Sequence, residues 1–370
     1  MENKNQTLGK EYYYGLDLLR SMMMLYGVIW HTGCWIWWKE WGFLETKIHQ
    51  SKDIFAVVSI PHIFRMETFF LVAGFLSCMV LSRKDKKQFF QARIKRVLFP
   101  LIFGCFCVNL LIVFYFKHID VFYGNFKLWN LFEHGWFLVC LFVFVIIDTF
   151  LNKTKFYSKE YIIIPLAFIA SVEVYQIWKL YHSFAGSQVY QTWKYYNQFQ
   201  SINFFGDLTS LFIEKPLIYF IYYYLGSRLY IRRDCLKNIN NKDIWYFTIL
   251  AIIFVFCASR LDNHYWHFAS QPRTFIVIAG ILMSLALFLI FYKIINKPNG
   301  KITNYLIDSS IVIYILHQPV VMLFGYYFDH LPINNITFFI MVCVFTFIFS
   351  FLLYEIIKRF KILKLMFGLK

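Results

Sequence analysis

Long apolar segments recur along most of this chain, and each is long enough to cross a lipid bilayer. A membrane-spanning α-helix needs about 20 mainly apolar residues, because each residue adds only about 1.5 Å along the helix axis. The segments of this kind are residues 15–38, 55–82, 97–116, 134–151, 160–178, 208–230, 244–259, 274–295, 304–328 and 336–357. The sequence therefore predicts an all-α, polytopic integral membrane protein with about ten transmembrane helices.

The composition agrees with a membrane protein and gives no sign of a second domain. Hydrophobic residues make up 59% of the 370 residues, and charged residues only 16%. That leaves too little polar surface to coat a soluble globule of this length. The chain has no repeat of solenoid period and no low-complexity tract. We therefore expect residues 1–370 to form a single transmembrane domain.

Positive charge is unevenly divided between the connecting segments, although the formal net charge is +16. Of the 37 Lys and Arg residues, 25 lie in or beside the two termini and every second connection, and 9 lie in the other connections. Lys and Arg accumulate on the cytoplasmic side of membrane proteins, so both termini are predicted to be cytoplasmic. The basic segments are expected to rest on anionic lipid headgroups, and nucleic acid is not an expected partner.

The first apolar segment contains ionisable residues where lipid is expected. Eleven positions separate Arg20 from His31, which brings the helix back to within about 20° of its starting direction, about 16 Å further along the axis. Asp17 falls on the same face. Arg20 is expected about 6 Å into the membrane and His31 about 22 Å from the inner end. Such residues are expensive at membrane depth, so this stripe is a candidate functional site.

Further ionisable residues lie inside other predicted spans. With both termini cytoplasmic, His62 is expected about 10 Å below the outer surface, with Arg65 near mid-bilayer. His317 is expected about 20 Å from the cytosolic end of its helix, and His134 begins its span at the outer surface. Together with His31, these residues predict a cluster of four imidazoles in the outer half of the membrane.

Several short motifs resemble those of one family of membrane enzymes. They are the Arg20 and His31 pair with Asp17 in the same helix, FRM at 64–66, FFLVAGFL at 69–76, RIKRVLFP at 93–100, HGWFL at 134–138 and IYILHQPVV at 313–321. Together they resemble the acyltransferase-3 family of integral membrane acyltransferases, and within it the branch that succinylates periplasmic glucans. The matching motifs occur in the family's order along almost the whole chain.

The resemblance implies transfer of an acetyl or succinyl group from cytosolic acyl-CoA to a hydroxyl of a periplasmic or cell-surface glycan, at the bacterial inner membrane. This reaction needs a base near neutral pH, and imidazole suits that role. We predict that His31 is the base, with Arg20 and Asp17 on the same helix face. Arg93 and Arg96 are predicted to bind the CoA phosphates, since guanidinium binds phosphate in bidentate geometry.

A second group of residues is predicted to bind the substrate, by positioning the acceptor or by stabilising the developing oxyanion. These residues are Arg65, His62, His134, His317 and Glu67. Glu67 lies two residues after Arg65, so it points to a roughly opposite face of its helix. The expected partners are the bilayer and a glycan or glycolipid, and no metal is expected because no helix carries an HxxH or HxxxH pair.

Three positions depart from the family pattern. Ala73 stands where the family usually has Ser, so a hydroxyl role at that position is not expected. Gly135 replaces the usual Leu, and Glu67 replaces a Pro. These departures leave the fold prediction intact but leave the acyl group and the acceptor open.

Other interpretations of the ionisable residues remain. A secondary transporter is the main alternative, because intramembrane Arg, Asp, Glu and His also line ion and substrate pathways. Against it, the sequence shows no inverted repeat and no matching pair of helices broken by Gly or Pro. Asp17 and Arg20 would otherwise form a local ion pair, the histidines could be hydrogen-bonded core residues, and the four imidazoles could hold a metal.

Overall fold

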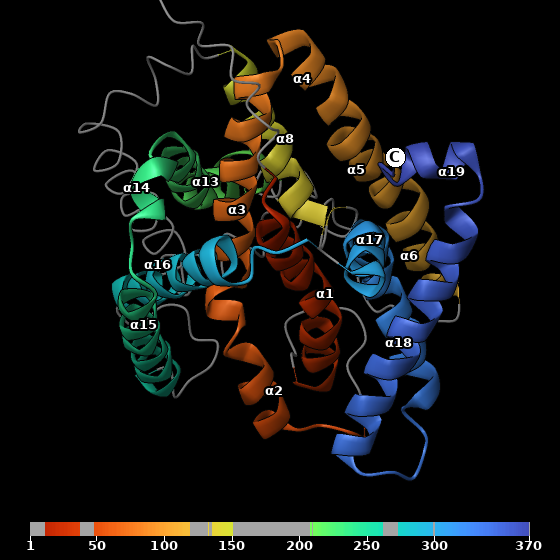
Figure 1. The fold of residues 1–370 in the computed structure, drawn as a ribbon. Coiled ribbons are helices and arrows are strands. Elements are labelled where there is room, and N and C mark those ends of the chain that lie inside the picture. Colours follow the sequence, from red (N-terminus) through yellow and green to blue (C-terminus); the bar gives the residue numbers. More distant parts are fainter. Residues whose placement is uncertain are drawn as a thin grey trace, which may run out of the picture.

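The structure is a computed structural model, and it describes residues 12–37, 48–118, 132, 135–150, 208, 210–261, 273–298 and 300–369. Within these residues every regular element is helical and no strand occurs. The helices form a bundle in which segments distant in the sequence lie side by side (Figure 1). The predicted all-α class is confirmed for this part of the chain.

The helices in chain order agree with the predicted spans. The first group is α1 (Tyr14–Trp37), α2 (Lys52–Ser59), α3 (His62–Arg83), α4 (Lys86–Arg93), α5 (Phe99–Phe103), α6 (Leu110–His118) and α8 (Trp136–Phe150). The second group is α13 (Lys215–Ile231), α14 (Arg233–Lys237), α15 (Asn241–Leu261), α16 (Arg273–Leu289), α17 (Lys301–Phe328), α18 (Asn335–Ile357) and α19 (Lys361–Met366). Single π-helical turns occupy Ile94–Leu98, Gly104–Asn109, Ser210–Glu214 and Ile290–Ile294.

Six of these helical stretches are long and apolar enough to cross a membrane. They are Lys52–Arg83, Lys86–Phe116, Asn241–Ser259, Phe275–Ile294, Lys301–Phe328 and Asn335–Ile357. The chain is therefore a multi-pass membrane protein. Every predicted span that falls within the described residues is helical, and the predicted span 160–178 lies outside them.

The predicted span 55–82 is divided rather than continuous. The first helix ends at Ser59 and the next begins at His62, with Ile60 and Pro61 between them. Pro61 has no backbone N–H to donate, and it precedes the first residue of α3, where a missing donor costs least. A single apolar run therefore becomes a short helix and a long one.

Helix α3 packs closely against α13 through two glycines. A Cβ added at Gly74 would collide with the carbonyl oxygen of Tyr223, and one added at Gly226 would collide with that of Leu71. The Ser227 hydroxyl donates across this contact to the Gly74 carbonyl at 3.2 Å. Small residues and interhelical hydrogen bonds are the usual means of joining helices in lipid, where burial of apolar surface gives little drive.

The C-terminal helix α19 lies beside α5, as Figure 1 shows. The ring of Phe367 packs edge-on against that of Phe103, with centroids 5.0 Å apart. Gly368 adopts the left-handed conformation with φ of 67°, and a Cβ there would lie 3.1 Å from Cα of Arg96. The end of the chain is therefore packed against the segment RIKRVLFP.

We predict that Gly226→Ala destabilises the protein strongly. The added methyl group meets backbone of α3, which no rotamer change can relieve, so the cost should reach or exceed the about 1–3 kcal/mol typical of overpacking. Thermal unfolding of the detergent-purified protein should show a midpoint several degrees lower. Gly300→Ala is the matched control, because nothing lies within 4 Å of its Cβ position. Equal midpoints for the two variants would contradict the packing argument.

Candidate functional site

Helix α1 carries the predicted arginine and histidine without interruption, since it runs from Tyr14 to Trp37. Arg20 forms an ion pair with Asp17, with an N–O distance of 3.1 Å. The Tyr12 hydroxyl also donates a hydrogen bond to Asp17. Burial, followed by the hydrogen bond to this carboxylate, raises the pKa of Tyr12, so the hydroxyl stays protonated as a donor. The local ion pair anticipated from the sequence is therefore present.

His31 and His317 meet in the interior of the bundle. Their exposed fractions are 5% and 0%, and their ring centroids are 4.8 Å apart in an edge-on arrangement. Nδ1 of His317 is 2.5 Å from the Tyr314 carbonyl oxygen, which can only accept a hydrogen bond. The proton therefore lies on Nδ1, and Nε2 of the neutral ring is left as an acceptor.

A buried guanidinium reaches the same place from α3. Arg65 is 3% exposed, and its Nε and Nη1 atoms have no hydrogen-bond partner among the described residues. A Cβ added at Gly27 would lie 3.0 Å from His317 Nε2 and 3.4 Å from Arg65 Nη1. Gly27 thus allows the imidazole and the guanidinium to approach the backbone of α1, one turn before His31.

His62 joins this group through the neighbour of His31. Its ring stacks on Trp30, with centroids 3.9 Å apart and planes inclined by 3°. Three residues further along α3 lies Arg65, on the same side of the helix. The structure therefore brings together His31, His62, Arg65 and His317 from three helices, as their predicted depths suggested. His134 lies outside the described residues.

The predicted phosphate-binding arginines form a second group. The Arg93 guanidinium carbon is 5.2 Å from the ring centroid of Phe89. Arg93 interacts electrostatically with both Arg20 and Arg96, so three like charges gather where α1 begins and α4 ends. The π-helical turn Ile94–Leu98 starts immediately after Arg93. Such turns occur frequently at functional sites.

Asp148 is a buried carboxylate beside this second group that the sequence analysis passed over. It is 1% exposed, and its Oδ2 accepts hydrogen bonds from the hydroxyls of Tyr223 at 2.5 Å and Ser77 at 3.1 Å. It also interacts electrostatically with Arg93. A lone acidic residue inside the apolar run 134–151 was the available signal, whereas its partners on α3 and α13 have no local signal.

Glu67 lies away from the histidine group, as its position two residues after Arg65 predicted. It faces α13 and α16, where Glu67 Cγ and the Tyr222 hydroxyl lie 3.4 Å and 3.6 Å from the point a Cβ on Gly280 would occupy. Its Oε2 atom is buried and has no hydrogen-bond partner among the described residues.

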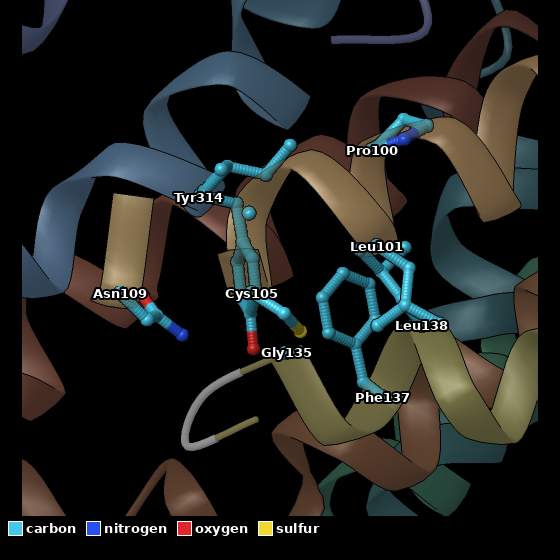
Figure 2. A pocket seen from close by; sticks show the side chains of 10 residues that line it. Pro100, Leu101, Cys105, Asn109, Gly135, Phe137, Leu138 and Tyr314 are labelled. Carbon is cyan, nitrogen blue, oxygen red and sulfur yellow. The ribbon is translucent and has the colours of Figure 1, made fainter. Parts of the chain in front are cut away.

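A small apolar cavity lies on the far side of Tyr314 from His317. Figure 2 shows the side chains around it, which come from α5, the following π-helical turn, the start of α8, and α17. The lining residues are Pro100, Leu101, Gly104, Cys105, Asn109, Gly135, Phe137, Leu138, Tyr314 and Ile315. Neither His31 nor His317 lines it. Tyr314 packs against Phe137 on one side, with centroids 4.3 Å apart, and against His317 on the other.

The histidine group does not have the composition of a metal centre within the part of the chain that the structure describes. No three His, Cys, Asp or Glu side chains converge there in an arrangement that could hold a metal ion. The charged partner that the imidazoles do have is the Arg65 guanidinium, which repels cations and attracts anions. The arrangement is suited to proton transfer beside a developing negative charge.

Comparison with known proteins agrees with this chemistry. The chain is 23% identical to the glucans biosynthesis protein C of Salmonella paratyphi B, Salmonella dublin and Salmonella enteritidis PT4, in alignments that cover 96% of this chain and 94% of each relative. No solved structure matches the chain significantly. The acyltransferase domain of the acyltransferase-3 family matches residues 13–355. The chain therefore belongs to the acyltransferase-3 family, and it is a membrane acyltransferase.

Proposed function

We propose that the protein transfers an acetyl or succinyl group from cytosolic acyl-CoA to a hydroxyl of a periplasmic or cell-surface glycan in a bacterial inner membrane. The observation that carries this proposal is the meeting of His31, His317 and the unpartnered Arg65 guanidinium inside the bundle. The family supplies the acyl transfer. The name of the relatives, glucans biosynthesis protein C, supports a glucan as the acceptor.

The proposed topology has about ten spans and cytoplasmic termini. The distribution of Lys and Arg supports it. The packing of Phe367 and Gly368 against the RIKRVLFP segment adds a second argument, because the C-terminus and Arg96 then lie on one side of the membrane. Arg20 is within electrostatic range of Arg93, so the start of α1 belongs to the same side. This side would face the cytosolic donor.

In the proposed reaction His31 accepts the proton of the acceptor hydroxyl as its oxygen attacks the acyl carbonyl carbon. The carbonyl oxygen becomes an oxyanion, and Arg65 stabilises it with its Nε and Nη1 hydrogens. When the C–S bond breaks, the CoA sulfur takes the proton from His31. The products are the glycan ester and free CoA, so no proton is left on the enzyme. His317, His62 and His134 would position the acceptor.

The donor would bind where the arginines gather. Arg93 and Arg96 would contact the CoA phosphates, with Arg20 held beside them by Asp17. Phosphate groups with several negative charges compensate the repulsion between the three guanidinium groups. No metal has a role in this scheme.

We predict that His31→Ala reduces acyl transfer about 10²- to 10⁴-fold, the usual contribution of a general base. The measurement is transfer of labelled acetyl from acetyl-CoA to a soluble glucose oligosaccharide by the purified protein in lipid vesicles. His330→Ala is the matched control, because this histidine is exposed at the end of α17. Full activity of the His31 variant would refute the proposed base.

We predict that Gly27→Ala lowers kcat about tenfold or more. The added methyl group displaces the His317 imidazole and the Arg65 guanidinium by a few tenths of an ångström, and misplacement by about 1 Å can cost 10²-fold. Steady-state kinetics should show little change in KM for acyl-CoA. Gly104→Ala is the control, because its Cβ would press only on the apolar Ile315, at 3.3 Å. Similar kcat losses for both variants would count against a specific effect.

We predict that Arg93→Gln raises KM for acetyl-CoA about 10- to 100-fold, as expected for loss of charge-assisted hydrogen bonds. With S-acetylpantetheine, which lacks the phosphates of the nucleotide end, KM should not change. Arg359→Gln removes an exposed cation from the end of α18 and serves as the control. An equal rise with both donors would place the effect on folding or chemistry instead of phosphate binding.

A further inference from the structure

Glu67 is a carboxylate near mid-membrane depth whose hydrogen-bonding capacity is unused. Its Oε2 is buried without a hydrogen-bond partner among the described residues. Arg65 is two residues away and interacts with it electrostatically, but two steps along the helix turn the side chains about 200° apart. An unsatisfied buried carboxylate is expensive, so this group is expected to have a function.

Two phenol side chains of α13 surround this carboxylate. Tyr222 and Glu67 both approach Gly280, whose missing side chain leaves room for α16 to come close to the Ile63 carbonyl oxygen, 2.9 Å from the Cβ position. Tyr219 lies one turn before Tyr222, on the same side of α13. Both tyrosines interact electrostatically with Glu67. The carboxylate therefore faces hydroxyl groups at the junction of three helices.

Aromatic rings extend from this junction to α8. The ring of Tyr219 stacks on Trp136, with centroids 5.1 Å apart and planes inclined by 29°. It also packs against Phe70, with centroids 4.8 Å apart. Lys215 places its ammonium group 4.3 Å from the centroid of Trp136. Half-buried aromatic faces thus adjoin a carboxylate and an ammonium.

We propose that Glu67, Tyr219 and Tyr222 form a subsite for a sugar unit of the acceptor. A sugar ring offers CH groups on its faces and hydroxyls around its rim, which match aromatic rings and a carboxylate acceptor respectively. A cationic ligand fits less well, because Arg65 and Lys215 both lie nearby. The inference rests on the proposed function and specifies where the acceptor is held, on the side of α3 opposite His31.

The test uses the full chain in lipid vesicles and compares Glu67→Gln with Glu67→Leu. Transfer from acetyl-CoA is measured while the concentration of a soluble glucose oligosaccharide is varied. Glu67→Leu should raise KM for the oligosaccharide about tenfold or more, and Glu67→Gln should raise it less, because the amide still accepts hydrogen bonds. KM for acetyl-CoA should not change in either variant. Glu355→Gln, at the end of α18, is the matched carboxylate control.

Three outcomes would overturn the subsite. The first is an unchanged KM for the oligosaccharide in Glu67→Leu. The second is an equal loss in both variants, which would indicate recognition of a cation. The third is a parallel rise of the KM values for both substrates. Tyr219→Phe removes one hydroxyl and keeps the ring, so a small specific rise in the oligosaccharide KM is expected even if Glu67→Leu folds poorly.

A binding measurement separates this inference from the proposed function. Calorimetric titration of the wild-type protein with the oligosaccharide, without any donor, should show binding that Glu67→Leu weakens by the same factor. If the wild-type protein binds the oligosaccharide but transfers nothing to it, the proposed reaction fails and the subsite stands. If it transfers acetyl groups but Glu67→Leu binds the oligosaccharide normally, the subsite fails and the reaction stands.

Discussion

The backbone contact between α3 and α13 determines where every polar group of α3 lies. At Gly74 and Gly226 each helix occupies the space that the other's Cβ would need, so neither helix can rotate or slide without a collision. Lipid gives helices little hydrophobic reason to associate, which makes such close contacts the main source of specificity. Helix α3 also packs on α1 and α16. A shift at the glycine contact would therefore disturb the whole candidate site.

Helix α3 presents polar side chains to different neighbours at successive depths. Arg65 reaches toward α1 and α17, Glu67 toward α13 and α16, and Ser77 binds Asp148 of α8. Each of these groups would be costly if it faced lipid. Because one rigid helix carries them all, the proposed sites for acceptor, chemistry and donor keep fixed relative positions. An enzyme that joins substrates from two sides of a membrane needs such a scaffold, since small displacements of reacting groups are costly.

Local features of the sequence predicted the helices and much of the histidine group, but not the contacts between helices. Apolar length gave the spans, and the helical repeat placed Arg20 and His31 on one uninterrupted helix. The proline-dependent break before α3 and the π-helical turns were missed, because apolar length alone does not report them. The role of Gly27 was missed because it depends on α3 and α17 meeting there. Asp148 was visible as a lone acid, but its partners are distant in the sequence.

The two intramembrane arginines differ in a way that bears on catalysis. The charge of Arg20 is already compensated by Asp17 at 3.1 Å, so a ligand that binds it competes with an existing partner. Arg65 is buried, with two nitrogen atoms unpartnered among the described residues, so its strongest interaction is left for an anion brought by the reaction. Only interactions that are stronger in the transition state than in the ground state accelerate a reaction. A buried guanidinium kept without an anion until an oxyanion forms meets that condition, whereas one neutralised in advance would bind substrate and transition state more nearly alike.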